Sequence, residues 1–321
     1  MSFANPLRAA LAVALLLGAV APAAAKLCGG ATPCACGDRV VEAAVLQSDL
    51  GPCPGSGLIV AAPVVLDCAG HTIAGNDTSN AKFGIHLDRV TGAEVRSCRV
   101  TAFRRGLRIN GGSRNRLSGN ESFANKYGID LAGGTSANEL AQNLVRDNRD
   151  EGVHLGGSSG NRIVGNELRY NKRENLYLLS SHDNYVADNV SHHSKQSAIY
   201  VKHSKRNVFV RNVVRDTALQ LRGDSTQNFF IDTYLKGNGY VLQAYQDANG
   251  WTHPHDNVML RDCIRKTDFC YRFTGAHDND AYAARTDGRC DPPVTLAAQG
   301  GQEAVGNDVE LLAQGCNDDP F

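Results

Sequence analysis

The sequence has no excess of either charge and no long apolar run beyond its first 25 residues. Lysine and arginine together number 33, and aspartate and glutamate also number 33. Nucleic acids and anionic membranes require clustered positive charge, so this balance favours neither as a partner. The one extended apolar run, residues 11–21, is much shorter than the roughly 20 residues that a transmembrane helix needs. We therefore expect no nucleic-acid partner and no membrane span.

The apolar run has the features of an export signal. Arg8 precedes it, and three alanines at positions 23–25 follow it closely. A positive charge, a short apolar stretch and a small-residue cleavage site, in that order, are typical of a secretory signal peptide. We predict that residues 1–25 are this signal and that the mature protein is secreted or periplasmic.

Cysteine is absent from the middle of the chain. The ten cysteines fall into two groups, Cys28, Cys34, Cys36, Cys53, Cys68 and Cys98 near the start and Cys263, Cys270, Cys290 and Cys316 near the end. An even number in an exported protein favours disulfides. The short Cys34–Cys36 spacing lacks the separated C-x2-C pairs of a structural zinc site. We expect disulfides to fasten both ends of the chain, with a pairing that the sequence leaves open.

The cysteine-free region carries a repeat of 23 residues. The segment NRLSGNESFAN at 115–125 has asparagine at every fifth position, and matching segments begin at 138, 161, 184 and 207. Ahead of the asparagines each unit has an alternating strand pattern such as YGIDL at 127–131, and two shorter strand patterns follow. Three strands in so short a unit leave no room for a helix, and helical repeats need about 33 residues or more. The spacing of a leucine-rich repeat does not recur either.

These units predict an all-β, single-domain right-handed parallel β-helix whose coils of three strands stack in register. We expect asparagine to occupy the bends in left-handed conformation, and to form ladders in which amides about 4.8 Å apart bond from coil to coil. Two such ladders are predicted, namely Asn120, Asn143, Asn166, Asn189 and Asn212, and Asn125, Asn148, Asn171, Ser194 and Thr217.

The ends of a solenoid need covers, because open strand edges invite aggregation. We place a cysteine-rich N-terminal cap with the first coil at 26–80, the parallel β-helix at 81–275 and a C-terminal cap at 276–321. An insertion near residues 248–255 interrupts the later coils. We expect the protein to be a monomer.

A family resemblance supports this fold. The segment LDCAGHTIAG at 66–75, followed by GIHL at 84–87 and by coils of the form N-x-hydrophobic-x-x-N, resembles exported right-handed β-helix proteins of the NosD-like or pectate-lyase-like group. The resemblance covers most of the mature chain. That group contains carbohydrate lyases, epimerases, surface proteins and a periplasmic accessory factor of copper-enzyme assembly, so it implies the fold and leaves the activity open.

A second, partial resemblance concerns YGID at 127–130. It is similar to the opening of the mannuronan C5-epimerase motif, in which Tyr-Gly-(Phe/Ile)-Asp is followed by Pro-His and an acid. Tyr127 and Asp130 match that motif, but Leu-Ala-Gly follows here, so the histidine of the motif is missing. We suggest that His154 in the next unit takes its place.

The outward positions of the first strand form polar columns along the predicted β-helix. The central column is His86, Arg108, Asp130, His154, Tyr177, Tyr200 and Gln220, the flanking columns being Arg105, Tyr127, Glu151 and Glu174 on one side and Asp88, Asn110 and Lys202 on the other. Neighbours in a column stand one coil, about 4.8 Å, apart. Such a polar track with aromatic rings suits a sugar chain lying across several coils. The expected partner is therefore a polysaccharide, including one that contains uronic acids.

Abstraction of the C5 proton of a uronate needs a cation beside the carboxylate, a base and a proton source. We assign these roles to Arg108, to His154 oriented by Asp130, and to Tyr127 or Tyr177. The expected substrate-binding residues are His86, Arg105, Glu151, Tyr200 and Lys202. This set would serve β-elimination or C5 epimerisation. The alternative is a non-catalytic surface or periplasmic protein that binds a ligand or acts as a NosD-like accessory factor.

The sequence contains two groups of residues whose side chains are metal ligands in other proteins. His192 and His193, near His182 and His203, have the side chains that bind copper or zinc. Adjacent strand residues point to opposite faces, so we expect this pair not to share an ion. Calcium is conceivable at Asp88, Asp130 or Glu151, although no calcium-binding loop motif occurs. We predict no metal cofactor, with calcium as the alternative.

Overall fold

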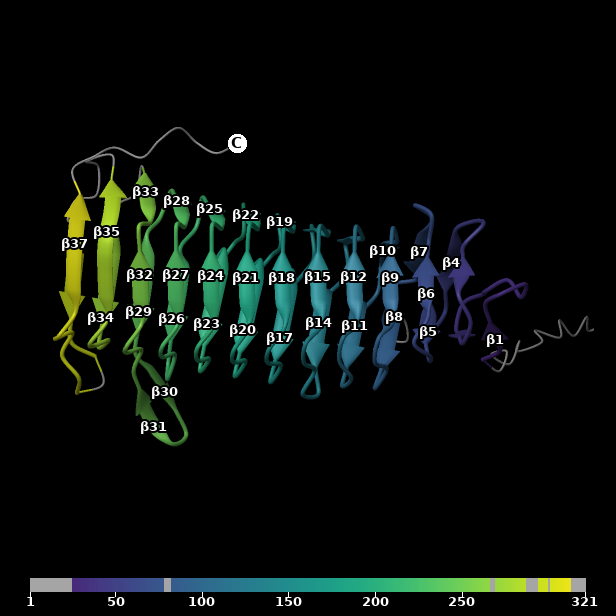
Figure 1. Ribbon diagram of the computed structural model, residues 1–321, viewed down its shortest axis with the longest axis horizontal. Helices are drawn as coiled ribbons and strands as arrows, with labels where there is room; N and C mark the ends of the chain where they lie inside the picture. The colour runs from purple at the N-terminus through teal and green to yellow at the C-terminus, as the bar shows by residue number, and fades with distance from the viewer. Residues whose placement is uncertain (1–24, 78–81, 266–268, 287–293, 300, 313–321) are drawn as a thin grey trace, which may run out of the picture.

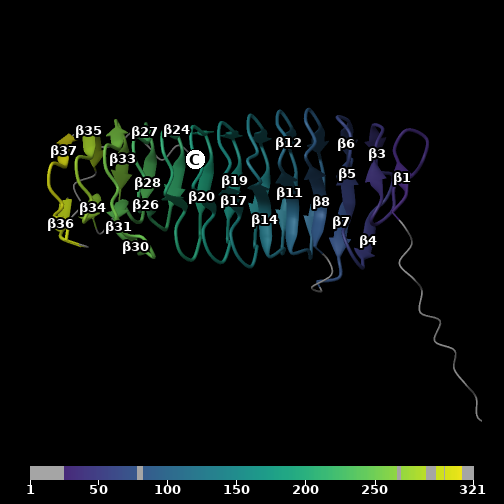
Figure 2. The same ribbon diagram turned by 90° about the horizontal axis from the view of Figure 1, so that it is seen from below.

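The computed structural model describes residues 25–77, 82–265, 269–286, 294–299 and 301–312. They form an elongated, right-handed parallel β-solenoid of about 11 turns (Figures 1 and 2). The predicted all-β fold and its coil length of about 23 residues are confirmed. No helix that could span a membrane occurs in this part of the chain. The predicted signal peptide lies almost entirely outside the described residues.

One face of every coil belongs to a 13-stranded parallel sheet, which we call the first sheet. Its strands, in order, are β1 (Leu27–Cys28), β2 (Arg39–Val40), β5 (Leu58–Val60), β8 (Phe83–Asp88), β11 (Arg105–Asn110), β14 (Tyr127–Ala132), β17 (Val153–Gly156), β20 (Leu176–Leu179), β23 (Ile199–Lys202), β26 (Leu219–Arg222), β29 (Tyr240–Gln243), β34 (Tyr271–Thr274) and β36 (Val294–Ala297). In β11, Leu107 and Ile109 are fully buried and Arg108 between them is not. The predicted alternation therefore holds, and it turns every second side chain of this sheet outward.

The remaining strands of the solenoid form a 22-stranded sheet with two strands per coil, which we call the second sheet. The first strands of the pairs are β3 (Ala44–Val45), β6 (Val65–Asp67), β9 (Glu94–Arg96), β12 (Arg116–Ser118), β15 (Glu139–Ala141), β18 (Arg162–Val164), β21 (Tyr185–Ala187), β24 (Val208–Val210), β27 (Phe229–Ile231) and β32 (Val258–Leu260). The other strands of the pairs are β4 (Leu50–Cys53), β7 (Thr72–Gly75), β10 (Arg99–Thr101), β13 (Glu121–Phe123), β16 (Leu144–Arg146), β19 (Glu167–Arg169), β22 (Val190–His192), β25 (Val213–Arg215), β28 (Tyr234–Lys236) and β33 (Cys263–Arg265).

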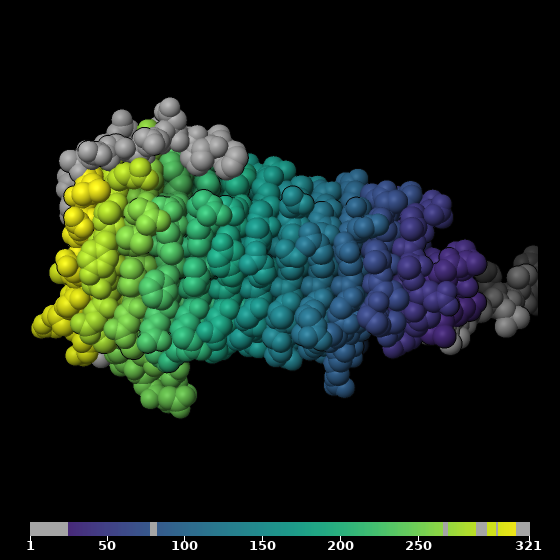
Figure 3. All heavy atoms as spheres, viewed as in Figure 1, coloured from purple at the N-terminus to yellow at the C-terminus, as the bar shows by residue number. Residues whose placement is uncertain are grey.

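The last described strands continue the solenoid. Strand β35 (Asp280–Thr286) pairs in parallel with β32 and β33, and β37 (Asp308–Leu312) pairs with β35. The segment expected to be a C-terminal cap therefore contains further coil strands. The predicted insertion is a short antiparallel hairpin of β30 (Tyr245–Asp247) and β31 (Gly250–Thr252), which projects from the side of the molecule (Figure 3).

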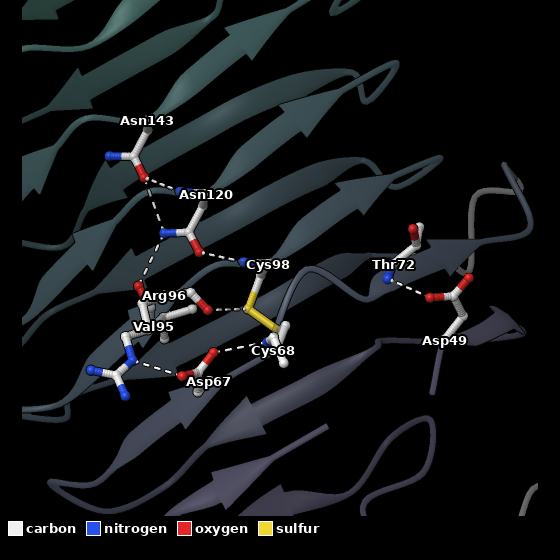
Figure 4. Close-up of a disulfide and its surroundings, with 10 residues drawn as sticks. Asp49, Asp67, Cys68, Thr72, Val95, Arg96, Cys98, Asn120 and Asn143 are labelled. Carbon is white, nitrogen blue, oxygen red and sulfur yellow. Dashed lines mark hydrogen bonds and ion pairs between the residues drawn. A yellow bond between two sulfur atoms is a disulfide. The ribbon is translucent and has the colours of Figure 1, made fainter. Parts of the chain in front are cut away.

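Asparagine ladders run along the solenoid, and there is one more than predicted. From Asn120 to Asn212, each backbone N–H donates to the Oδ1 of the next ladder residue at 2.9–3.1 Å, and Figure 4 shows the first step. The second predicted ladder bonds from Asn125 through Asn148 to Asn171. The additional and longest ladder comprises Asn115, Asn138, Asn161, Asn184, Asn207, Asn228, Asn257, Asn279 and Asn307.

The expectation that asparagine itself is left-handed at the bends is wrong. The left-handed residue is the one before it, as at Gln142 (φ 56°) before Asn143 and Asp188 (φ 57°) before Asn189. The chain turns at that residue, and the asparagine that follows buries its amide against the backbone of the neighbouring coils. A left-handed non-glycine residue costs roughly 1 kcal/mol or more, and the ladder bonds offset this cost.

Disulfides fasten the N-terminal end, as predicted. They join Cys28 to Cys34, Cys36 to Cys53 and Cys68 to Cys98. The last of these links neighbouring coils beside the start of an asparagine ladder (Figure 4). At the other end, Cys263 and Cys270 are also disulfide-bonded, whereas Cys290 and Cys316 lie outside the described residues.

One ladder position near the C-terminal end holds a buried acid. Asp262 is fully buried, and its carboxylate accepts hydrogen bonds from the backbone N–H of Thr233 at 2.7 Å and from the hydroxyl of Tyr240 at 2.6 Å. Burial raises the pKa of Asp262 to about 8 from its ordinary 3.8, and the hydrogen bonds from Tyr240 and Thr233 oppose this rise only in part. The acid is thus a pH-dependent element of the core.

We expect Asp262→Asn to stabilise the protein above neutral pH. Because the folded-state pKa of about 8 exceeds the ordinary value of 3.8, the folded state holds the proton more tightly, and stability falls as the pH rises between these two values. Asparagine keeps an acceptor for Thr233 without the charge. The free energy of unfolding at pH 8.5 should rise by about 1–3 kcal/mol, with little change near pH 4. Urea unfolding at both pH values measures this, and an equal effect at the two would contradict it.

Candidate functional site

The outward residues of the first sheet align from coil to coil as predicted. Register pairs join His86 to Arg108, Arg108 to Asp130, Asp130 to His154, His154 to Tyr177, Tyr177 to Tyr200 and Tyr200 to Gln220. We call this row the outward column. Because the strands are parallel and in register, side chains that are far apart in the sequence become direct neighbours.

Asp130 is the centre of the column. It is only 2% exposed, and its Oδ2 accepts hydrogen bonds from Arg105 Nε at 2.6 Å and from Arg108 Nη1. Its Oδ1 lies 2.9 Å from Nδ1 of His154. Burial by itself would raise the pKa of Asp130, but the hydrogen bond from His154 and the charges of Arg108 and Arg105 outweigh it and lower the pKa. Asp130 is therefore ionised at neutral pH.

The ionised carboxylate decides which nitrogen of His154 carries the proton. A carboxylate without a proton can only accept hydrogen bonds, so Nδ1 of His154 is the donor to Asp130. In the neutral imidazole this leaves a lone pair on Nε2. A Cβ added at Gly156 would lie 3.1 Å from Cε1 of His154, so this glycine provides the space in which the ring lies.

Tyrosine rings surround His154. The ring of Tyr127 is 6.4 Å away between centroids and that of Tyr177 is 5.4 Å away, and Tyr200 stacks on Tyr177 at 5.0 Å. Burial raises the pKa of both Tyr177 and Tyr200 above the ordinary 10.0. Both phenols therefore keep their protons at neutral pH and can donate hydrogen bonds.

Two buried carboxyl groups adjoin the column. Glu151 and Glu174 are 3% and 2% exposed, and burial raises the pKa of each. Arg173 donates to Oε1 of Glu151 at 2.8 Å, and its Nε forms an ion pair with Oε2 of Glu174 at 3.4 Å. Oε2 of Glu151 makes no hydrogen bond to the described residues. Buried carboxyl groups with raised pKa values are common at sites of proton transfer. Arg173 was not among the predicted site residues. Its place in the sequence directly before Glu174, which was assigned to a flanking column, is the signal that indicates it lies beside the site.

The remaining predicted residues lie toward the two ends of the column. His86 stacks on Phe83 at 4.4 Å, and its Nε2 is buried without a hydrogen-bond partner among the described residues. Burial lowers the pKa of His86. Lys202 places its Nζ 3.5 Å from the ring centre of Tyr245, on the projecting hairpin. The structure thus brings together the central predicted residues, Arg105, Arg108, Tyr127, Asp130, His154, Tyr177 and Tyr200, and directs Lys202 to the hairpin. Phe83 and Tyr245 were missed, although Phe83 pairs in register with Arg105 and shares its column.

A second cluster of polar side chains lies on the second sheet. The expectation that His192 and His193 point to opposite faces is wrong, because their Nδ1 atoms are 2.7 Å apart. Strand β22 ends at His192, and His193 is left-handed with φ 51°, which breaks the alternation of side chains. Among the histidine, cysteine, aspartate and glutamate residues of the described ranges, one group of three or more has candidate ligand atoms that all lie within 4.8 Å of one another. It consists of His192, His193 and Asp216.

Solved structures of other proteins share this fold. Dettilon tailspike protein has a TM-score of 0.63 at 12% identity, covering 84% of this chain and 60% of its own. The catalytic domain of Agl-KA has a TM-score of 0.58 at 9% identity, covering 84% of this chain and 62% of its own. The A-module of the mannuronan C-5 epimerase AlgE4 of Azotobacter vinelandii has a TM-score of 0.47 at 12% identity, covering 88% of this chain and 78% of its own.

This chain therefore spans about three fifths of the first two of these proteins. At such low identity the likeness to these two proteins shows the fold alone. No curated protein sequence is detectably similar to this chain. A match to a protein-family model is more specific than these likenesses in fold. The model of the NosD family, which is described as a periplasmic copper-binding protein, matches residues 65–261. Because this match extends from β6 to just beyond β32 and covers more than half of the sequence, the protein belongs to the NosD family.

Proposed function

We propose that this protein binds an acidic polysaccharide along the outward column and removes the C5 proton of a uronate residue, as a polysaccharide lyase or a C5-epimerase. The observation that carries the proposal is the pairing of ionised Asp130 with Nδ1 of His154 at 2.9 Å, beside two arginines. This pairing fixes the tautomer of the imidazole. It makes Nε2 of His154 a base whose side chain is 22% exposed and can reach a bound sugar.

The charges beside His154 suit a carboxylated substrate. Arg105 and Arg108 share the single carboxylate of Asp130, so one positive charge is left over for a second carboxylate. When the base takes the C5 proton, negative charge develops on the neighbouring carboxylate of the sugar, and a fixed cation stabilises it. The arginines would therefore bind the substrate and also lower the barrier to proton removal.

The two reactions differ in what happens to the electron pair that is left on C5 when the proton is removed. In β-elimination the pair forms a C4–C5 double bond and the C4–O bond breaks, with a proton delivered to the leaving oxygen. In epimerisation a proton returns to C5 from the opposite face. Tyr177, whose pKa burial raises, or Tyr127, across the ring of His154, would supply the proton. Rings of Tyr127, Tyr177 and Tyr200 would also contact the sugars.

Membership of the NosD family supports a second candidate, a non-catalytic periplasmic accessory or binding protein. In that case the outward column would hold a ligand without changing it. The same residues would then matter for affinity alone.

An assay on alginate, pectate, glucuronan and glycosaminoglycans tests the proposal. β-Elimination by a base at His154 produces an unsaturated uronate that absorbs at about 235 nm, so a lyase gives a rising absorbance. An epimerase gives no rise but introduces deuterium at C5 in heavy water, which NMR detects. If neither signal appears with any polymer while one of them binds, the catalytic proposal is wrong and the binding candidate holds.

A further inference from the structure

The turn that follows β22 gathers nitrogen and oxygen donors from two neighbouring coils. Nδ1 of His192 lies 2.7 Å from Nδ1 of His193, and the latter lies 3.3 Å from Oδ2 of Asp216. The candidate ligand atoms of these three residues are all within 4.8 Å of one another. Three donors thus converge on one point of the surface, on the second sheet and away from the outward column of the first sheet.

The backbone explains how adjacent histidines meet. His193 and Asp216 occupy equivalent left-handed positions, with φ of 51° and 70°, at the ends of β22 and β25 in successive coils. The left-handed turn swings the His193 ring to the side on which His192 projects, and parallel stacking places the Asp216 carboxylate one coil further along. The fold does not require a histidine or an aspartate at these two bends, because glycine adopts the left-handed conformation with less strain.

Neighbouring side chains hold the two imidazoles in place. The ring of Tyr170 stacks on His193 at 4.6 Å and meets His192 edge-on at 6.0 Å. Oε1 of Glu167 lies 3.6 Å from Nε2 of His192 and is itself bound by Arg169 at 3.0 Å. A carboxylate beside the far nitrogen of a histidine is the usual partner of a metal ligand, because it orients the ring and makes the near nitrogen more basic. Glu167 and His192, but not His193 or Asp216, line a neighbouring surface hollow.

We propose that His192, His193 and Asp216 bind one divalent transition-metal ion of the copper and zinc class, through both Nδ1 atoms and the carboxylate. Two imidazoles and one carboxylate are donors that suit Cu(II) and Zn(II) and do not suit Ca²⁺ or Mg²⁺. Affinities of such sites rise toward copper in the first transition row, so Cu(II) binds more tightly than Zn(II). This donor set fits the copper-binding description of the NosD family. No feature of the proposed sugar site is needed for it.

Titration of the purified protein with Cu(II) against a competing chelator, followed by electron paramagnetic resonance, tests the site. We expect one tightly bound Cu(II) per chain, a spectrum with nitrogen ligands, and binding of Zn(II) weaker by about tenfold or more. His192→Ala and His193→Ala should each weaken Cu(II) binding by about tenfold or more. His255→Ala is the matched control, because His255 lies on a different coil from the proposed site, is partly exposed, and has its Nδ1 2.9 Å from a carboxylate oxygen of Asp256.

Several results would overturn the site. They are an absence of tight Cu(II) binding, wild-type affinity in both His192→Ala and His193→Ala, or a loss that follows His255→Ala instead. Circular dichroism of each variant shows whether it is folded. If His193→Ala is not folded, His193→Gln replaces it, because glutamine keeps the side-chain volume that packs against Tyr170. His154→Ala should bind Cu(II) as the wild type does, so failure of this site and failure of the sugar site are separate outcomes.

Discussion

Asn166→Ala is expected to lower the free energy of unfolding by about 3 kcal/mol or more without changing polysaccharide binding. Oδ1 of Asn166 accepts hydrogen bonds from the backbone N–H and from Nδ2 of Asn143, both at 2.9 Å. Its Nδ2 donates to the carbonyl of Leu140 and to Oδ1 of Asn189, also at 2.9 Å. Alanine leaves the Asn143 N–H and the Leu140 carbonyl without these partners in the interior, and each unsatisfied buried group costs about 1–3 kcal/mol.

Thermal and urea unfolding measure this loss, and a sugar-binding titration below the melting transition measures function. Asn249→Ala is the matched control, since Asn249 is exposed on the projecting hairpin and its loss should change stability by less than about 0.5 kcal/mol. Asn166 lies at the bend between strands β18 and β19 of the second sheet, whereas the outward column lies on the first sheet. Wild-type stability of Asn166→Ala would show that the ladder bonds contribute little.

His154→Ala is expected to have the opposite effect, a loss of about 100- to 10,000-fold in the rate of C5 proton removal with a much smaller loss of stability than Asn166→Ala. Among the described residues, His154 is the base that Asp130 orients through a hydrogen bond, so the variant lacks the proposed proton acceptor. Its removal leaves Asp130 still bound to Arg105 and Arg108.

Absorbance or deuterium uptake gives the rate, and calorimetry gives the melting temperature. His255→Ala serves again as the control, because it removes an imidazole of similar exposure far along the solenoid. Asp130→Asn gives a sharper test of the tautomer, since a neutral amide no longer fixes the proton on Nδ1 and should reduce the rate with the imidazole still present. A large fall in melting temperature for His154→Ala, with an unchanged rate, would assign His154 to the fold instead of the reaction.

Much of the candidate site follows from the repeat. A period of 23 residues per coil makes Arg108, Asp130 and His154 neighbours on one face as soon as the strands are parallel, and the register pairs confirm this. The same reasoning fails where the backbone leaves the strand. His192 and His193 meet because a left-handed residue ends β22, and alternation applies only within a strand.

The solenoid, its coil length and the alternation of inward and outward residues within strands follow from periodicity, which a linear pattern displays directly, and the disulfide-fastened start follows from the positions of the cysteines. Tertiary structure alone decided which cysteines pair, that Arg173 binds Glu151, that Lys202 turns to Tyr245, and that His192, His193 and Asp216 converge. These contacts depend on side-chain rotamers and on single left-handed residues. Each of these side chains and backbone positions has several accessible conformations in the unfolded chain, and the packing of adjacent coils selects one of them.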